Sequence, residues 1–247
     1  RHMAMALDLG VDVFRIAAHC TEADITDRHI AFARKHGKEV YGVLMMSHMA
    51  SPDQLADEAF KMQGYGAEGV IIMDSSGHYL PLDVSERIGA LVEMLSIPVG
   101  FHAHNNLGMG IANSVSAVQA GATIIDGSAR GFGAGSGNAQ LEVLVAVFKK
   151  MGYETGIDLY KMLDAADIAE KEIMPSLPYI SSTSIVSGLS GVFSGFIKEV
   201  NRVSAEHGVD ARDIFVQLGT RNAVAGQESL ILEVALALKA DNISEAR

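Results

Sequence analysis

Two histidines separated by one residue, His102 and His104, end an apolar run in the stretch IPVGFHAHNNLG (residues 97–108). The run predicts a buried strand, since proline precedes it and asparagine and glycine follow it. Side chains two positions apart on a strand point to the same side, so the two imidazoles project together. Two such imidazoles can bind one metal ion, and zinc, manganese and iron all accept this ligand. Two asparagines follow directly and Asp74 ends the preceding predicted strand, so we favour a metal site over a pair of hydrogen-bonded histidines.

Short apolar, β-branched segments recur along the first part of the chain and must position these histidines. They cover residues 11–19, 39–48, 68–77, 98–105 and 123–131. Amphipathic stretches with helical periodicity lie between them, several opening on Asp or Ser and closing on Gly. One strand and one helix recur about every 26–30 residues, which predicts βα units whose strands pair in parallel. The opening stretch, RHMAMALDLG, predicts the tail of a helix closed by Gly10.

Polar side chains at the ends of these strands favour a TIM barrel over an open doubly wound sheet. In a (β/α)8 TIM barrel the active site collects residues from many strand ends, whereas an open doubly wound sheet uses one switch point. Here the polar residues at or near predicted strand ends are Arg15, His19, Ser47, His48, Asp74, Ser75, His102, His104, Asp126 and Ser128. We therefore predict a TIM barrel, of which about five βα units are visible.

A change of pattern near residue 150 predicts two domains. Residues 1–150 are expected to form the C-terminal part of a (β/α)8 barrel with the metal site, and residues 151–247 a helical domain. The stretch 156–178 predicts an amphipathic helix ended by its prolines. The small-residue run SSTSIVSGLSGVFSGF (181–196) carries regularly spaced apolar residues, which favours a close-packed helix over a flexible linker.

Composition excludes several classes of function. The chain has 247 residues, 49% of them hydrophobic and 20% charged, as in ordinary globular proteins. A net charge of −11 argues against binding nucleic acid or an anionic membrane as the main role. No apolar run approaches the ~18 residues of a membrane span. The single cysteine, Cys20, excludes an internal disulfide and predicts a buried thiol in a reducing, cytoplasmic environment.

A glycine-rich segment, ARGFGAGSGNAQLEV (129–143), follows the last predicted strand and opens a helix. Its backbone N–H groups suit an anion at a helix N-terminus. It is not a dinucleotide-binding motif, because Ser136 or Asn138 occupies the position of the third glycine in either register, and it lacks the Gly-Lys-Ser/Thr of a P-loop. An anion site and a tight turn that requires glycine are both open at this point.

A set of motifs in order gives the chain a family resemblance. The motifs are HCTEAD, LMMSHM, MDSSG, GFHAHNNLGMGIANSVSAVQAGA, GFGAGSGNAQLEV and DLYKMLDAAD, joined by GVFSGF and GQESLILEVALAL near the C-terminus. Together they resemble the metal-dependent 4-hydroxy-2-oxovalerate aldolases of the pyruvate-carboxyltransferase-like TIM-barrel superfamily. The HxHN element alone indicates only the superfamily, whereas the ordered set is more specific.

This resemblance implies cleavage of 4-hydroxy-2-oxovalerate to pyruvate and acetaldehyde, in the catabolism of aromatic compounds. A divalent metal, usually Mn²⁺ with Mg²⁺ and Co²⁺ as alternatives, is expected to be chelated by the substrate carboxylate and keto oxygens. Such a metal stabilises the pyruvate enolate as a Lewis acid. His102 and His104 match the family's two metal imidazoles, and Ser75 and His102 match substrate contacts.

The family's remaining catalytic groups lie outside these motifs. They are an aspartate that completes the metal site, an arginine that polarises the keto group and a histidine base, all on the first barrel strand. This strand is expected upstream of Arg1, and about 80–90 residues are needed there to close eight strands. The catalytic arginine, aspartate and base are therefore unassigned, and we expect the chain to be a C-terminal portion of the enzyme.

Two aromatic positions depart from the family pattern. The family's GYAGVYSSF corresponds to GLSGVFSGF here, which places Leu189 and Phe193 where tyrosines are usual. No phenol remains at either position. This difference suggests a longer or more apolar aldehyde product.

The resemblance also implies partners, and two other functions stay open. Aldolases of this kind assemble with an acylating acetaldehyde dehydrogenase, and a homo-oligomer is expected. One alternative is a Claisen-type acyl transferase or lyase, similar to isopropylmalate synthase or hydroxymethylglutaryl-CoA lyase, which acyl-CoA dependence would reveal. The other is a non-catalytic remnant that retains only the partner surface, which would release no pyruvate in a metal-dependent assay.

Overall fold

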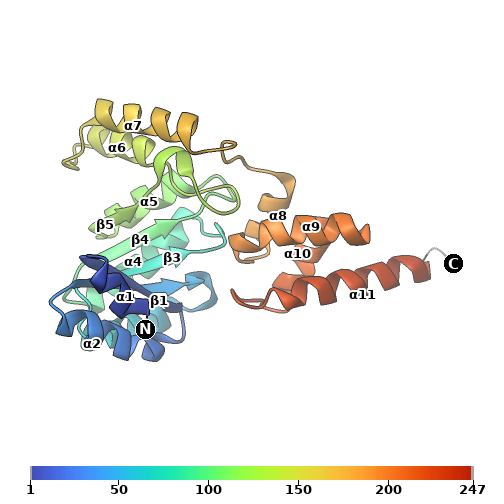
Figure 1. Ribbon diagram of the computed structural model, residues 1–247, viewed down its shortest axis with the longest axis horizontal. Helices are drawn as coiled ribbons and strands as arrows, with labels where there is room; N and C mark the ends of the chain where they lie inside the picture. The colour runs from blue at the N-terminus through green and yellow to red at the C-terminus, as the bar shows by residue number, and fades with distance from the viewer. Residues whose placement is uncertain (1, 246–247) are drawn as a thin grey trace. The chain divides into compact units, whose positions relative to one another are not determined.

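The computed structural model describes residues 2–245 (Figure 1). These residues divide into two compact units. The first unit comprises Arg1–Asp74, Tyr79–His102 and Ala112–Asp126, and the second comprises Ser75–His78, Ala103–Ile111 and Gly127–Arg247. The second unit therefore takes two short segments from within the strand-and-helix part of the sequence. The division at residue 150 expected from the sequence stays a prediction.

One parallel sheet forms the centre of the first unit, with its strands in chain order. The strands are β1 (Val13–His19), β2 (Glu39–Met45), β3 (Val70–Asp74), β4 (Val99–Ala103) and β5 (Ile124–Asp126). The sheet order is β1-β2-β3-β4-β5, and the β1/β2, β2/β3 and β4/β5 ladders are all parallel. The five strands predicted from the sequence are thus confirmed, each shorter than its predicted segment.

The sheet is strongly curved, as a barrel requires. Five strands spaced by ~4.8 Å would separate β1 from β5 by about 19 Å if the sheet were flat. Arg15 of β1 nevertheless contacts Asp126 of β5 at 2.6 Å. Two side chains could not span the distance between these strands if the sheet were flat. A chain-order sheet with this curvature has no switch point, which confirms a TIM-barrel-like α/β fold over the doubly wound alternative.

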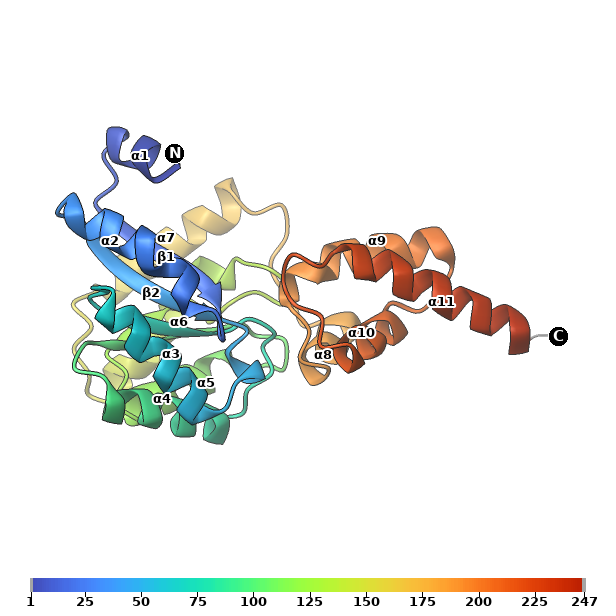
Figure 2. The ribbon, with the colours of Figure 1, turned by 90° about the horizontal axis from the view of Figure 1, so that it is seen from below.

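Helices connect the strands and cover the sheet. They are α2 (Asp27–Lys35), α3 (Pro52–Gly64), α4 (Pro81–Met94) and α5 (Gly110–Gln119), with short 3₁₀ turns η1 (Ala23–Thr26) and η2 (Ser47–Met49); a further helix, α1 (His2–Asp8), precedes β1. α2 and α3 pack against β2 (Figure 2). Gly10 ends α1 in the left-handed region (φ +83°), as its sequence predicts. The core between sheet and helices is apolar, with Val40, Leu44, Val70 and Phe101 fully buried.

Helices make up most of the chain from residue 141 to 245. They are α6 (Leu141–Lys150), α7 (Leu159–Glu172), α8 (Ser182–Leu189), α9 (Ile197–His207), α10 (Ala211–Thr220) and α11 (Ser229–Glu245); the 3₁₀ turns η3 (Ala129–Gly131) and η4 (Ser194–Phe196) complete the unit. α8, α9 and α11 share an apolar core with α10. Among the described residues, no helix combines the length and apolar character that a membrane crossing requires. The predicted helical C-terminal region is confirmed.

The small-residue run forms a helix over its first half. Ser184, Ser187 and Gly188 of α8 are buried, and a Cβ on Gly188 would lie 3.0 Å from the Leu107 side chain. Small residues are needed here because the neighbouring chain approaches this closely. The prediction of a close-packed helix holds for α8, and the run then turns at Ser190 into the segment that leads to η4.

Candidate functional site

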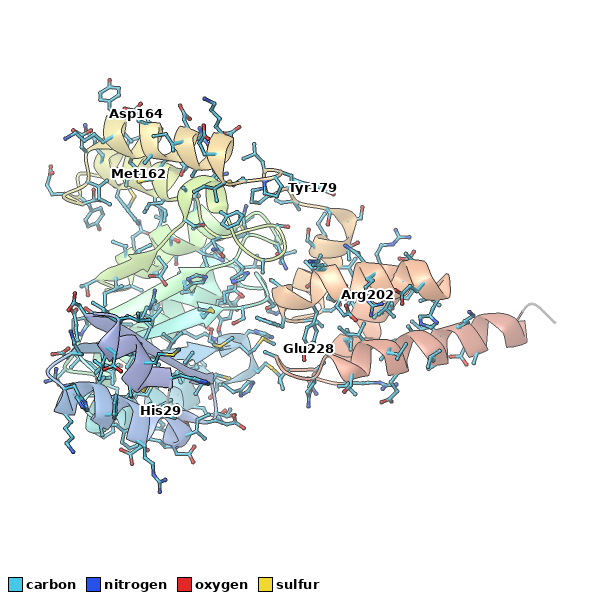
Figure 3. All side chains as sticks on the ribbon, in the orientation of Figure 1. His29, Met162, Asp164, Tyr179, Arg202 and Glu228 are labelled. Carbon is cyan, nitrogen blue, oxygen red and sulfur yellow. The ribbon has the colours of Figure 1, made fainter. Side chains whose placement is uncertain are left out.

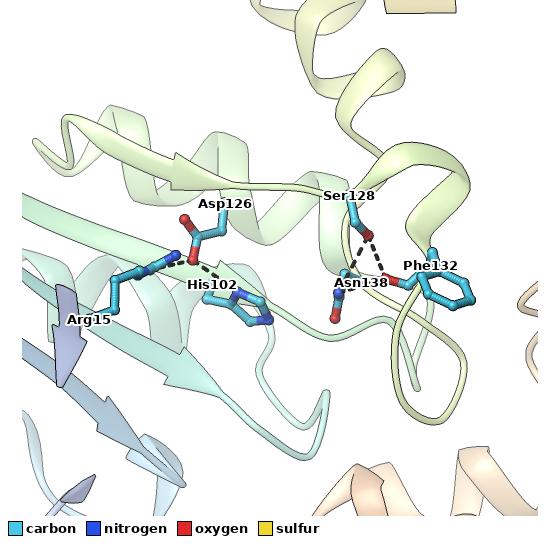
Figure 4. A network of polar contacts seen from close by, with 6 residues as sticks. All are labelled: Arg15, His102, Asp126, Ser128, Phe132 and Asn138. Atoms are coloured by element: carbon cyan, nitrogen blue, oxygen red, sulfur yellow. Dashed lines mark hydrogen bonds and ion pairs between the residues drawn. The ribbon is translucent and has the colours of Figure 1, made fainter. Parts of the chain in front are cut away.

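His102 lies in β4 directly beside Asp126 of β5. The two residues are register partners in the parallel ladder, so their side chains leave the sheet on the same face. The His102 Nδ1 lies 2.9 Å from the Asp126 Oδ2 (Figure 4). The side chains are 18% and 16% exposed, so this hydrogen bond is largely shielded from water.

Arg15 reaches the same carboxylate oxygen from β1. Its Nη2 donates to the Asp126 Oδ2 at 2.6 Å, although Arg15 lies in the middle of its strand and not at the end (Figure 4). Burial by itself would raise the pKa of the Asp126 carboxyl. Hydrogen bonds from His102 and Arg15, together with the Arg15 charge, outweigh burial and hold this pKa below its ordinary value of 3.8. Asp126 is therefore an anion at neutral pH.

His104 follows one residue after β4 and belongs to the second unit. It forms an antiparallel bridge with Asn138 and is 7% exposed. The bridge joins His104 to the glycine-rich segment, and the expectation that the imidazoles of His102 and His104 leave the chain on the same side stays a prediction.

The donor set at this position is two imidazoles. Within residues 2–245, no group of three His, Cys, Asp or Glu side chains is gathered closely enough to hold a metal ion. Asp74, which the sequence suggested as support for the site, is fully buried and accepts a hydrogen bond from the Tyr79 backbone N–H at 3.1 Å. It therefore shapes the turn after β3. The chemistry of the two imidazoles fits a divalent metal that takes its other ligands from oxygen donors.

Ser75 and Ser47 follow the ends of β3 and β2 and are both fully buried. The Ser75 carbonyl accepts a hydrogen bond from the Ser194 N–H at 3.0 Å. The Ser47 hydroxyl donates to the Met73 carbonyl at 2.8 Å and lies 2.9 Å from the Tyr79 hydroxyl. Ser47 therefore ties two strand ends together, and a substrate contact at Ser75 stays a prediction.

Asn106, which served in the sequence only as support for a metal site, connects three segments of the second unit. Its Nδ2 donates to the Ser194 hydroxyl at 2.9 Å, and its Oδ1 accepts from the Ser136 N–H at 3.2 Å. The side chain is fully buried. The asparagine of the HxHN element thus joins the loop after β4 to the glycine-rich segment and to the helical region. Its place next to the histidines was the only signal in the sequence.

The glycine-rich segment is a tight turn. Gly131, Gly135 and Gly137 all have φ between +66° and +85°, a region that favours glycine. A Cβ on Gly137 would lie 2.1 Å from the Gly131 carbonyl oxygen. Asn138 holds the turn by donating to the Phe132 carbonyl at 3.1 Å, and Ser128 donates to the same carbonyl at 2.8 Å (Figure 4).

Many backbone N–H groups in and after this segment donate hydrogen bonds within the protein. The N–H groups of residues 131, 132, 136, 137, 138 and 139 all donate to protein oxygens. At the start of α6, those of Leu141, Val143 and Leu144 do the same. An anion at these donors would have to displace these bonds, but the N–H groups of residues 133–135 are not among them, so the segment forms a tight turn and an anion site stays open.

Leu189 and Phe193, the two positions without the usual tyrosines, differ in burial. Leu189 is 65% exposed at the end of α8. Phe193 is partly buried and packs edge-to-face on Phe196, with 5.7 Å between ring centroids. The Phe193 ring therefore fills the apolar edge of the helical core.

Cys20 is a structural thiol, as its sequence context predicts. It is fully buried, and burial raises its pKa to about 12. The thiolate needed for nucleophilic chemistry is therefore not populated at neutral pH.

Family models match two segments of the chain. The HMGL-like family matches residues 13–169, and the DmpG-like communication domain matches residues 178–240. The first match covers β1 to β5, α2 to α6 and most of α7, and the second covers α8 to α10 and most of α11.

Curated relatives are close in sequence. A 4-hydroxy-2-oxovalerate aldolase of Pectobacterium atrosepticum is 67% identical over 95% of this chain and 68% of its own length. The enzyme of the same name from Spirochaeta aurantia is 66% identical over 95% of this chain and 69% of its own length. The chain thus spans about two thirds of the length of these relatives.

Solved structures show the same fold at low identity. A complete multifunctional pyruvate carboxylase from Rhizobium etli superposes with a TM-score of 0.82 at 16% identity, over 98% of this chain and 24% of the carboxylase. The N-terminal domain of a putative aldolase from Bacteroides vulgatus superposes with a TM-score of 0.67 at 25% identity, over 82% of this chain and 67% of that domain.

Proposed function

Because the chain belongs to the 4-hydroxy-2-oxovalerate aldolase family of carbon–carbon lyases, we propose that it cleaves 4-hydroxy-2-oxovalerate to pyruvate and acetaldehyde with a divalent metal at His102 and His104. The observation that carries this proposal is the pair of imidazoles one residue apart at the end of β4, with a carboxylate on His102 Nδ1. We propose Mn²⁺ as the metal, with Mg²⁺ and Co²⁺ as alternatives.

The chain's own residues have three roles in this proposal. His102 and His104 hold the metal by their ring nitrogens, and Ser75 and His102 contact the substrate. When bound, the metal supplies Lewis-acid stabilisation of negative charge on the keto oxygen. A base takes the 4-hydroxyl proton, the C3–C4 bond breaks to release acetaldehyde, and its electron pair forms the pyruvate enolate, which is then protonated. The base, the arginine and the third metal ligand are assigned to no residue of this chain.

The test measures pyruvate release by the protein as its native source produces it. After chelation with EDTA, pyruvate release is expected to fall to background and to return on addition of Mn²⁺. His104→Asn is expected to lower kcat/KM by about 10³-fold, because Lewis-acid stabilisation supplies several kcal/mol. His29→Asn is the matched control, since His29 is an exposed histidine of α2 (Figure 3).

Three results would contradict the proposal. Pyruvate release that is indifferent to EDTA would exclude the metal mechanism. A requirement for an acyl-CoA would favour the Claisen-type alternative, and no turnover at all would favour the partner-binding remnant. The intact mass of the native protein gives an independent check. The reaction needs a third metal ligand and a base in addition to His102 and His104, and a mass greater than that of this chain would mean that further residues can supply them.

We propose that residues 178–240, which match the DmpG-like communication domain, bind an acylating acetaldehyde dehydrogenase. The exposed apolar side chains Val216, Leu232 and Leu236 on α10 and α11 support such a role, since large exposed apolar side chains are typical of interfaces.

We further propose a homo-oligomer, a cytoplasmic location and a place in the catabolism of aromatic compounds. Sedimentation with and without the purified dehydrogenase tests both assemblies; a single monomer peak in both runs would contradict them.

We also propose that Phe193 shifts the substrate preference toward longer or more apolar 4-hydroxy-2-oxo acids. Its ring offers no phenol and packs on Phe196. A series of substrates with one to three added methylenes should show rising kcat/KM, and Phe193→Tyr should reduce the preference. A clear optimum at 4-hydroxy-2-oxovalerate would overturn this proposal and leave the aldolase function intact.

A further inference from the structure

Asp126 carries an unusual combination of partners for a residue with no assigned role. Its Oδ2 accepts from His102 Nδ1 at 2.9 Å and from Arg15 Nη2 at 2.6 Å (Figure 4). Its side chain is 16% exposed, so these two donors and not bulk water surround the Oδ2 atom. All three residues belong to the first unit and come from β1, β4 and β5.

The sheet itself fixes the contact between Asp126 and His102. The two residues are Cα partners in the parallel β4/β5 ladder, and the hydrogen bond joins side chains that already leave the same face. Arg15 approaches from the other edge of the curved sheet and fixes the carboxylate from the opposite direction. The position of the carboxylate is therefore determined by backbone pairing and by a second ion pair.

A carboxylate at one ring nitrogen determines what the other can do. A neutral imidazole carries its proton on one nitrogen and a lone pair on the other. A carboxylate oxygen that accepts at 2.9 Å from Nδ1 favours the tautomer with the proton on Nδ1, which directs the Nε2 lone pair away from Asp126. Carboxylates placed in this way orient metal-binding histidines and raise their basicity.

We infer that Asp126 is a positioning residue for the proposed metal site: it holds His102 as the Nδ1–H tautomer with Nε2 directed to the metal, and Arg15 secures Asp126 in this role. This inference rests on the proposed function. Asp126 touches neither the reacting atoms nor the metal in this arrangement and acts only through His102.

The first measurement needs no metal. In the native protein labelled with ¹⁵N-histidine and freed of metal with EDTA, the His102 signals, assigned by their loss in His102→Gln, are expected to show the Nδ1–H tautomer. Asp126→Asn is expected to shift this equilibrium toward a mixture, because an amide can either donate to or accept from Nδ1. Asp126→Glu retains the carboxylate and should restore part of the preference of His102 for the Nδ1–H tautomer.

The second measurement is Mn²⁺ affinity by titration calorimetry. Asp126→Asn is expected to weaken binding by about 10–100-fold, and Asp126→Glu by less. Arg15→Gln should weaken it by a smaller factor, since the Asp126–His102 pair persists. Asp164→Asn is the matched control, because Asp164 is an exposed aspartate on α7 (Figure 3). Circular dichroism melts of each variant separate loss of affinity from loss of fold.

The outcomes are distinct. An unchanged tautomer, or unchanged Mn²⁺ affinity in a folded Asp126→Asn protein, would overturn the inference and leave the proposed function standing. An unsubstituted protein that binds no Mn²⁺ would overturn the proposed function and the inference together. Loss of both the tautomer and the affinity in Asp126→Asn, with partial recovery in Asp126→Glu, supports the inference.

Discussion

The strand ends and the C-terminal helices use their buried residues differently. Among the buried residues at the strand ends and the loops that follow are Ser47, Asp74, Ser75, His104 and Asn106. The core shared by α8 to α11 is built from aliphatic and aromatic side chains, such as Val200, Phe215 and Ile231. Each buried polar group needs a specific hydrogen-bond partner, whereas an apolar core needs mainly volume and shape.

This difference separates the two regions in how they tolerate change. Substitutions in the helical core should affect stability and leave the chemistry of the histidines alone. Substitutions at the strand ends should alter specific contacts and hence activity. Single substitutions, each with a matched control, test this separation.

The largest effect on stability is expected for Phe215→Ala in α10. Phe215 is fully buried in the helical core, and removing its ring should lower the free energy of unfolding by about 3–5 kcal/mol. Val216→Ala is the matched control, since Val216 is 46% exposed on the same helix and should change stability by no more than about 0.5 kcal/mol. Urea unfolding measures both. A change in Mn²⁺ affinity of folded Phe215→Ala would break the proposed separation of the two regions.

Gly137→Ala should damage both stability and activity. Alanine is strained at φ +85°, which costs about 1–3 kcal/mol, and its Cβ would collide with the Gly131 carbonyl. Gly89→Ala in α4 is the control, because its Cβ meets no atom within 4 Å and helix propensity should add about 0.5–1 kcal/mol. Thermal unfolding and pyruvate release measure the two effects. If Gly137→Ala were as stable as the parent, the tight-turn interpretation would be wrong.

Asp158→Ala should have a moderate effect limited to α7. The Asp158 side chain caps this helix by accepting from the Lys161 N–H at 3.0 Å, and loss of such a cap costs about 1 kcal/mol. Asp164→Ala, on the exposed face of the same helix, removes the same charge without removing a cap. Chemical denaturation should show a lower free energy of unfolding for Asp158→Ala only. An equal decrease in both variants would refute the capping role.

The smallest effect concerns pH. Hydrogen bonds from the Arg212 side chain and backbone lower the pKa of Asp210 to about 2, at the N-terminus of α10. A lowered pKa in the folded state adds stability above the unfolded value of about 3.9, and this stability is lost as pH falls toward 2. Asp210→Asn keeps a capping oxygen but not the charge, so its unfolding free energy should depend less on pH between 4 and 2. If the unfolding free energy of Asp210→Asn and of the parent protein changed equally with pH, this assignment would be contradicted.

Much of the fold could be predicted from the sequence because local patterns determine it. Alternating strand and helix segments gave the five strands, and the polar residues at their ends favoured a barrel. The glycine-rich segment shows the limit of this approach. Its composition suits an anion site and a tight turn equally; the positive φ of its glycines shows the turn, and an anion site there stays open.

The candidate site was predicted only in part, for a geometric reason. His102 and His104 stood out because their spacing matches the period of a strand. The contact between Arg15 and Asp126 depends on the curvature of the whole sheet, and the bond between Asn106 and Ser194 joins positions far apart in the chain. Neither spacing nor residue type encodes such distances. The metal assignment and the substrate contact at Ser75 stay predictions.

The register between β4 and β5 limits how this sequence can change in length. Because His102 and Asp126 are ladder partners on one face, a shift of β5 by one residue would turn Asp126 to the opposite face and bring a different residue beside the imidazole. A two-residue shift would restore the face but leave another side chain opposite His102. Insertions and deletions in the turn between α5 and β5 should therefore be rare among functional descendants of this sequence, whereas surface loops elsewhere can vary in length.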